Sequence, residues 1–378
     1  MQVAALDAEL LRRLAEIQLE RPLVLSLYFD FNPSEFATPP ARATAVRSVL
    51  DAADRALRER NDELGHAERT DLQGSLEQAR ELLSNDLTDV PPGLAVFVSR
   101  GQGLFETIGL ARPVPNCVAI DRSPLVGPLT GVAQRERWCV VLVSRRDARV
   151  FRGSTDGLRE VDQIRDDVPG QHDQGGWSQA RYQRSVEKEV ADHLKNSAER
   201  LLQHWKRQPF QRLVLGGPRE VVAEFEGKLH DYLADCVAGH IEVDVESASP
   251  QQVLEASRDL FESLEEQHER EALARLDEGS RGVAGVEEVL PPLNERRVEA
   301  LLLEEGRSAP GSLCPACGWL GPVSERRCPI DGTKLEARDD ITEPAIELAI
   351  QQSAEVLPVR RLAEELRERG GVAALLRF

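Results

Sequence analysis

Apolar and polar positions along the first third of the chain predict a mixed sheet with helices. The run PLVLSLYFDF at 22–31 is typical of a strand, and a long polar helical pattern covers about 42–84 with a break near Gly65. Two strand-like runs around a glycine-containing turn at 93–110 predict a hairpin. Together they indicate an α/β domain over residues 1–130.

The middle of the chain has strands first and alternating elements afterwards. The runs WCVVLV and ARVFRG are joined at SRRD, and LREVDQI follows as a third strand. A long helix is predicted to start near Ser178, followed by the strand RLVLGG, a helix from Pro218 and a strand HIEVDVE at 240–246. This order predicts a mixed α/β domain over residues 131–276, closing with a charged helix at 251–276.

The last third has the order expected of an α/β/α sandwich. A helix and a strand come first, and the chain ends in the order helix, strand, helix, strand. Between these two parts lies a cysteine-bearing segment, predicted to be a small insertion at 312–338. The fold class is therefore α/β in three domains, the third covering residues 277–378.

Charge and composition narrow the range of functions. The formal net charge of -18 disfavours wholesale adhesion to nucleic acid, so any RNA contact must be local. Few aromatic residues argue against a stacking platform for single-stranded RNA. No apolar stretch is long enough to cross a bilayer and the start has no signal-peptide core, which predicts a cytoplasmic protein without a membrane partner.

The cysteine segment has the spacing of a zinc ribbon. Two residues separate Cys314 from Cys317, ten residues follow, and Cys328 and Asp331 are again separated by two. Paired thiolates from tight turns can hold a tetrahedral ion, and a carboxylate is an accepted zinc ligand. The spacing predicts a closed, structural zinc site; the alternatives are a ribbon that has lost its metal and a redox-active cysteine pair.

A glycine-rich loop precedes the long helix of the middle domain. The loop QHDQGGWSQARYQR contains Gly175 and Gly176, and Gln179 follows three residues later. Basic side chains three, four and seven residues apart then share one helix face, which predicts phosphate contact through Arg181, Arg184, Lys188 and Lys195. One alternative is an ordinary surface loop beside a solvent-exposed helix, without a binding role. Another is an acid/base pair formed by His172 and Asp173.

Several strings resemble a known family. The ending GGVAALLRF at 370–378 is similar to the closing strand of the third domain of eukaryotic and archaeal class-one release factors and Pelota. The strand at 212–217 followed by a proline-started helix is similar to their middle domain. The bacterial branch, which includes Balon-type hibernation factors, looks like the nearest match, and the loop also resembles the Gly-Gly-x-Gln loop of Vms-type peptidyl-tRNA hydrolases.

The resemblance implies a role at the ribosome. Glycines suit a narrow arm, and the amide of Gln179 would orient water beside an ester, supported by Gly175 and Gly176. The chain departs from the family in two ways. It has neither the Asn-Ile-Lys-Ser nor the Tyr-x-Cys-x-x-x-Phe string that reads stop codons, and Trp177 and Ser178 separate the glycines from the glutamine.

Two main hypotheses follow from the resemblance. The first is a binding factor, monomeric off the ribosome, that contacts rRNA in the A site, mimics tRNA in outline and is delivered by elongation factor Tu or a similar GTPase, in hibernation or rescue. The second is a peptidyl-tRNA hydrolase that uses Gln179. A metal-dependent nuclease is a third hypothesis, but it needs several clustered carboxylates, and the strands at 139–152 carry only Asp147.

Overall fold

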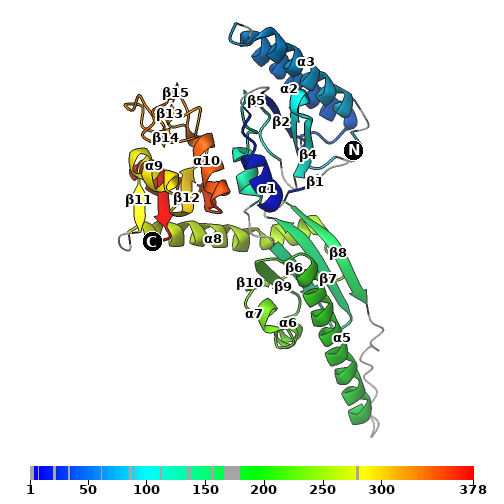
Figure 1. Ribbon diagram of the computed structural model, residues 1–378. Coiled ribbons are helices and arrows are strands. Elements are labelled where there is room, and N and C mark those ends of the chain that lie inside the picture. The colour runs from blue at the N-terminus through cyan, green and yellow to red at the C-terminus, as the bar shows by residue number, and fades with distance from the viewer. Residues whose placement is uncertain are drawn as a thin grey trace. The chain divides into compact units, whose positions relative to one another are not determined.

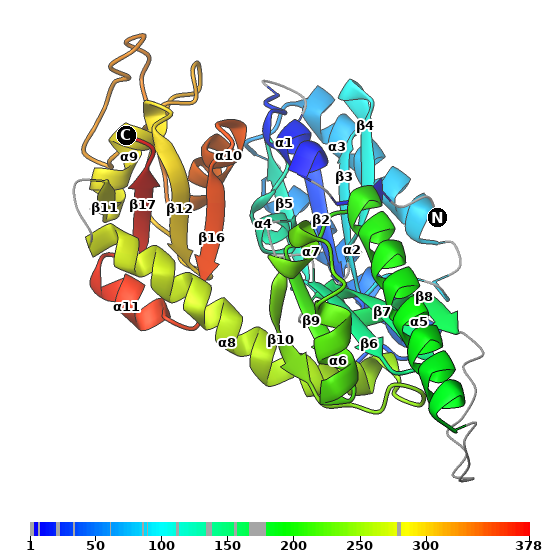
Figure 2. The same cartoon turned by 90° about the horizontal axis from the view of Figure 1, so that it is seen from below.

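The structure of the protein is a computed structural model (Figures 1 and 2). It describes residues 4–6, 8–19, 23–32, 35–60, 62–84, 87–88, 90–110, 113–133, 138–154, 157–165, 179–277 and 281–378. Residues 1–135 and 266–378 form one compact unit, and residues 136–265, the middle unit, form another. The domain boundaries expected near 130 and 276 remain a prediction. Among the described residues, no helix has the length and apolar character of a membrane span.

The first sheet lies in the N-terminal part of the larger unit. Its strands have the order β1-β4-β3-β2-β5. They are β1 (Ala4–Ala5), β2 (Val24–Asp30), β3 (Gly93–Ser99), β4 (Leu104–Leu110) and β5 (Cys117–Asp121). The helices of this part are α1 (Ala8–Ala15), α2 (Pro39–Glu59), α3 (His66–Leu83), the short 3₁₀ helix η1 (Arg100–Gln102) and α4 (Gly127–Ala133). The predicted hairpin is confirmed, because β3 and β4 pair antiparallel.

The helical pattern at 42–84 forms two helices, as its break predicted. Thr38 caps α2 by accepting from the amide of Ala41, and apolar residues spaced by three and four pack α2 on the sheet. The second helix begins after Gly65, whose amide donates to the Glu68 carboxylate at 2.7 Å. This return bond satisfies an amide that the helix leaves free, so α3 starts at the predicted break.

The sheet of the middle unit combines parallel and antiparallel strands in the order β10-β9-β6-β7-β8. The strands are β6 (Trp138–Val143), β7 (Asp147–Ser154), β8 (Gly157–Arg165), β9 (Arg212–Gly216) and β10 (Val237–Ile241). The helices are α5 (Gln179–Arg207), α6 (Arg219–Glu226), α7 (Asp231–Ala234) and α8 (Pro250–Asp277), which continues into the other unit. Apolar clusters cover both faces: α5 and α6 pack on one, and the first part of α8 packs on the other.

One strand of the middle unit was predicted with the wrong bounds. The pattern HIEVDVE predicted a strand at 240–246, whereas β10 begins at Val237 and ends at Ile241. Its partner β9 ends at Gly216, opposite Ile241, so later residues have no neighbouring strand to pair with. The Asp244 carboxylate then accepts from the Ser247 amide, which turns the chain toward α8.

The last third is the α/β/α sandwich that the sequence predicted. Its sheet has the order β11-β17-β12-β16, with α9 and α10 on one face and α11 and the end of α8 on the other. The strands are β11 (Gly282–Ala284), β12 (Val298–Glu304), β16 (Glu355–Val359) and β17 (Val372–Leu376). The helices are α9 (Val286–Asn294), α10 (Thr342–Gln351) and α11 (Ala363–Glu368). The cysteine segment leaves this sandwich between β12 and α10.

Helix α10 carries two buried carboxyl groups toward the N-terminal part of the same unit. Glu343 accepts from the amides of Val126 and Gly127, and Glu347 accepts from the hydroxyl of Ser123 and the amide side chain of Gln18. Burial raises the pKa of Glu343 to about 7 and that of Glu347 to about 8, although these hydrogen bonds oppose the rise. Both groups therefore titrate near neutral pH.

Candidate metal centre and candidate RNA-binding helix

A three-stranded sheet carries the cysteine segment, which we call the ribbon (residues 311–338). Its strands β13 (Gly311–Leu313), β14 (Leu320–Gly321) and β15 (Glu336–Arg338) have the order β14-β13-β15. The first knuckle follows β13 directly, and the second precedes β15. The ribbon buries Cys314, Cys328 and Leu335 in a small cluster, with Trp319 packed against them. The expected zinc-ribbon-like insertion is therefore present as a separate small sheet.

The two knuckles have the same backbone geometry. In the first, the Gly318 amide donates to the carbonyl of Cys314 at 3.0 Å, and Gly318 has a φ of 76°. In the second, the Gly332 amide donates to the carbonyl of Cys328 at 2.9 Å, and Gly332 has a φ of 75°. Glycine adopts this left-handed conformation without strain. Asp331 thus occupies in the second knuckle the place that Cys317 has in the first.

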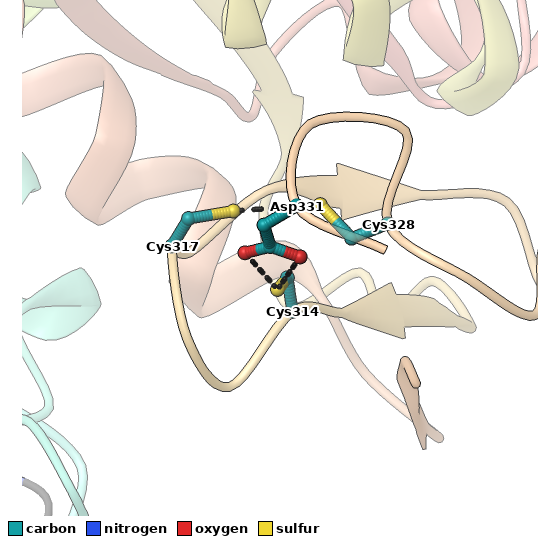
Figure 3. Close-up of side chains that lie close together, drawn as sticks. All are labelled: Cys314, Cys317, Cys328 and Asp331. Carbon is teal, nitrogen blue, oxygen red and sulfur yellow. Dashed lines mark hydrogen bonds between the residues drawn. The ribbon is translucent and has the colours of Figure 1, made fainter. Parts of the chain in front are cut away.

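The four predicted ligands converge on one point (Figure 3). Their ligand atoms all lie within 4.8 Å of one another. The Cys314 sulfur lies 3.5 Å from Asp331 Oδ2, and the sulfurs of Cys317 and Cys328 lie 3.5 Å apart. A tetrahedral zinc ion would separate two thiolates by about 3.8 Å and a thiolate from a carboxylate oxygen by about 3.5 Å. These spacings fit one tetrahedral ion, so the four residues could hold a metal.

Electrostatics at the site favour a cation. The backbone amide of Thr333 donates to Asp331 Oδ1 at 2.8 Å, which holds the pKa of Asp331 well below its ordinary value. Asp331 is therefore a carboxylate at neutral pH. Cys314 and Cys328 are buried, while Cys317 and Asp331 are exposed, so the cluster lies at the surface of the ribbon.

The glycine loop falls outside the part of the chain that the structure describes. Gly175 and Gly176, with His172 and Asp173, lie within the undescribed residues 166–178. Gln179 is the first residue of α5, but its side chain and that of Arg181 are also outside the described part. The predicted roles of these residues remain predictions.

Three members of the predicted basic stripe (Arg181, Arg184, Lys188 and Lys195) are exposed on helix α5. These are Arg184, Lys188 and Lys195, and Lys195 lies 3.9 Å from the Glu199 carboxylate. Another side of the helix packs on the sheet through residues spaced by three and four, namely Val190, Leu194, Ala198 and Leu201. The N-terminal half of the helix extends past the strands of the middle unit (Figure 1).

Comparisons with known proteins agree with this architecture. Residues 124–262 match the family described as Bacterial archaeo-eukaryotic release factor family 10. A protein of Thermococcus sibiricus named Peptide chain release factor subunit 1 is 25% identical over 391 residues, covering 89% of this chain and 94% of the relative. A protein of the same name from Archaeoglobus fulgidus is 28% identical to this chain over 317 residues, covering 76% of this chain and 77% of the relative. The chain is therefore similar to release factors along most of its length.

Two solved structures are also similar to this chain. An archaeal translation termination factor, aRF1, is 19% identical with a TM-score of 0.28 and covers 99% of both chains. Archaeoglobus fulgidus Pelota is 17% identical with a TM-score of 0.32 and covers 76% of this chain and 79% of that one.

Sequence patterns did not reveal which basic residues of α5 are already paired. Arg200 donates to both carboxylate oxygens of Asp162 on β8, at 2.6 and 2.9 Å, and His204 lies 2.7 Å from the same group. Burial of Asp162 favours its neutral form, but these hydrogen bonds outweigh burial and lower its pKa. Nearly forty residues separate the partners in the chain, so no local pattern shows the pairing.

Proposed function

We propose that this protein binds the ribosome and occupies the A site, where it protects idle ribosomes or engages stalled ones. The observation that supports this most is the basic stripe on α5, within the segment that matches a release factor family. The curated relatives are peptide chain release factors by name, and they match nearly the full length of the chain. We extend the ribosome, as the site where such factors act, to this chain. The protein would then work in the cytoplasm.

The shape of α5 suits entry into a site made of RNA. At about 1.5 Å per residue its 29 residues span about 43 Å, whereas the six residues of β6 span about 20 Å. Of the described side chains before Val186, those of Arg184 and Ser185 are exposed and do not belong to the apolar clusters of the middle unit. A single helix is narrow, and Arg184 and Lys188 on its exposed side would meet RNA phosphates.

A hydrolase that releases nascent chains is the second candidate. The position of Gln179 favours it, because this residue opens α5 at the end that extends past the sheet. An amide there would orient a water molecule without adding charge. Trp177 and Ser178 between the glycines and Gln179 favour occupancy over hydrolysis. Without the stop-codon strings, neither candidate reads a codon.

We place a structural zinc ion in the ribbon as part of this proposal. Three thiolates and one carboxylate at tetrahedral spacings fit zinc, and such a set leaves no ligand position open for water. Zinc would hold the ribbon together and take no part in a reaction. The similarity to release factors and Pelota suggests three partners. They are rRNA, tRNA and a translational GTPase such as elongation factor Tu.

Two assays on the full chain test the proposal. Co-sedimentation with 70S ribosomes at moderate salt should show the protein in the ribosomal pellet, and its absence there would contradict binding. Release of peptide from loaded ribosomes then separates the two candidates. Release that disappears in Gln179→Ala supports the hydrolase, whereas ribosome binding without release supports occupancy.

A further inference from the structure

A surface hollow lies between β8 and the C-terminal end of α5, at the other end of this helix from Gln179. Two adjoining depressions that share Val161, His204 and Arg207 make up the hollow. The remaining lining residues are Arg152, Arg159, Glu160, Asp162, Arg200, Gln203 and Gln208. The lining therefore contains four arginines and two carboxylates, in a chain that is acidic overall.

Both carboxylates of the hollow are already held by other cations. Asp162 accepts hydrogen bonds from Nε and Nη2 of Arg200 and also contacts His204. Glu160 forms a two-point pair with Arg149, at 2.9 and 2.6 Å, and Arg149 lies outside the hollow. Neither carboxylate is left to neutralise the arginines that remain.

Two of the remaining arginines have no partner among the residues that the structure describes. Arg159 and Arg207 are exposed, and the side chain of neither forms a hydrogen bond or ion pair with any residue in the described part of the chain. Arg159 also lies directly opposite Arg152 in the β7–β8 ladder. Like charges at directly opposite positions of a sheet destabilise it, and a bound anion would relieve the repulsion.

Arg152 is built into the wall of the hollow. It is 8% exposed, donates to the carbonyl of Gln208 at 2.9 Å and lies 4.9 Å above the ring of Phe210. This packing fixes one guanidinium in advance, so less side-chain freedom is lost when an anion binds. The hollow thus combines this fixed arginine with the exposed guanidinium groups of Arg159 and Arg207.

The opposite end of the same sheet is also hollowed, but its charges are balanced. There Arg145, Arg146 and Arg219 are accompanied by four carboxylates, those of Glu220, Glu242, Asp244 and Glu246. Of these two hollows, only the one at Arg159 and Arg207 therefore has an excess of arginine over available carboxylate.

We infer that the hollow lined by Arg152, Arg159 and Arg207 binds a phosphate group of an RNA backbone. A guanidinium group can donate two parallel hydrogen bonds to two oxygens of one phosphate, and an RNA backbone carries a phosphate at every nucleotide. The inference rests on the proposed function and extends it, because it gives α5 a second RNA contact. About twenty residues, or about 30 Å of helix, separate Arg207 from the stripe at Arg184 and Lys188.

The full chain is tested for binding to a fluorescein-labelled RNA hairpin with a twelve-pair stem. Fluorescence anisotropy measures the affinity over a range of KCl concentrations. Removing one phosphate-binding cation lowers the salt slope by about one, so Arg159→Gln/Arg207→Gln should lower it by about two and weaken binding on the order of tenfold to a hundredfold at about 0.1 M KCl. The matched control Arg145→Gln/Arg146→Gln should bind as the wild type does.

Three results would overturn the inference. These are an unchanged slope and affinity in Arg159→Gln/Arg207→Gln, an equal weakening in the control, and a wild-type chain that does not bind the hairpin. A labelled oligoglutamate peptide that binds as tightly as the hairpin and loses affinity in the same variant would reassign the hollow to an acidic protein. Ribosome co-sedimentation is scored separately, so the proposed function can fail while hairpin binding persists, and the reverse.

Discussion

The small cluster of the ribbon contains three buried residues, two of which, Cys314 and Cys328, are proposed metal ligands, whereas the sheet of the middle unit is covered by apolar clusters on both faces. So small a cluster contributes little toward the conformational entropy cost of ordering a segment of nearly thirty residues, a cost that a tightly bound metal would offset. In the middle unit, packing supplies the stability. We therefore expect the ligating residues of the ribbon to stabilise its fold and the exposed basic residues of the middle unit to act in binding.

Removing one ribbon ligand should have the largest effect. Cys314→Ser takes a buried sulfur from a four-ligand site, and we expect complete loss of bound zinc with disorder limited to the ribbon. Mass spectrometry for metals and limited proteolysis at 311–338 measure this. Cys117→Ser, at a half-buried thiol elsewhere, should keep its zinc. Unchanged metal content in Cys314→Ser would contradict the site.

Charge reversal on α5 should weaken ribosome binding strongly and leave stability unchanged. Because Arg184 and Lys188 are exposed, Arg184→Glu/Lys188→Glu should weaken ribosome binding by about a hundredfold with a thermal midpoint like that of the wild type. Arg258→Glu/Arg270→Glu on α8 changes net charge equally at exposed ion pairs and serves as the control. Equal losses of binding in the two variants would show that net charge matters and the stripe does not.

The buried carboxyl groups of α10 provide a contrast with exposed Asp331. A carboxyl whose pKa is higher in the folded than in the unfolded chain holds its proton more tightly when folded. Its contribution to stability is therefore full at low pH and is lost as pH rises from about 4.5 toward the folded values of about 7 and 8.

Glu347→Gln should remove this pH dependence in part. Gln keeps one of the two oxygens, which can still accept from Ser123 or from Gln18, and it cannot ionise. We expect it to raise the free energy of unfolding on the order of 3 kcal/mol at about pH 8.5 with little change at about pH 5. Thermal or urea unfolding at both pH values measures the difference. Glu364→Gln, at an exposed residue, is the control. The same difference in free energy of unfolding between variant and wild type at both pH values would contradict a Glu347 that is protonated in the folded chain.

Replacing the carboxylate ligand of the ribbon should have the smallest effect. Because Asp331 has the position in its knuckle that Cys317 has in the other, Asp331→Cys should keep one zinc ion and resist a chelator slightly better, since thiolate is the softer ligand. Competition with a chromophoric chelator measures the exchange. Loss of zinc in Asp331→Cys would mean that the knuckles are not equivalent.

Local sequence patterns predicted most of the fold and the four side chains that the ribbon brings together. The break at Gly65, the β3–β4 hairpin and the four-residue cluster each depend on residues close together in the chain. Features that depend on distant partners were not predictable. The end of β10 depends on where β9 stops, and Arg200 is paired because Asp162 lies beside it in space.

The same distinction applies to charge. The sequence gives no sign that Arg200 is paired, while the structure pairs it with Asp162 and leaves the side chains of Arg159 and Arg207 unpaired among the described residues. The burial of Glu343 and Glu347 likewise depends on segments more than two hundred residues earlier in the chain. An alternation of polar and apolar residues on one helix carries no sign of such partners.

A cryo-EM map of the full chain on 70S ribosomes would show whether the protein occupies the A site. We predict density for the protein there, with the basic stripe of α5 against rRNA and the end at Gln179 directed toward the peptidyl-transferase centre. Density for the protein away from the A site, or a bound protein whose α5 stripe faces solvent, would contradict this prediction.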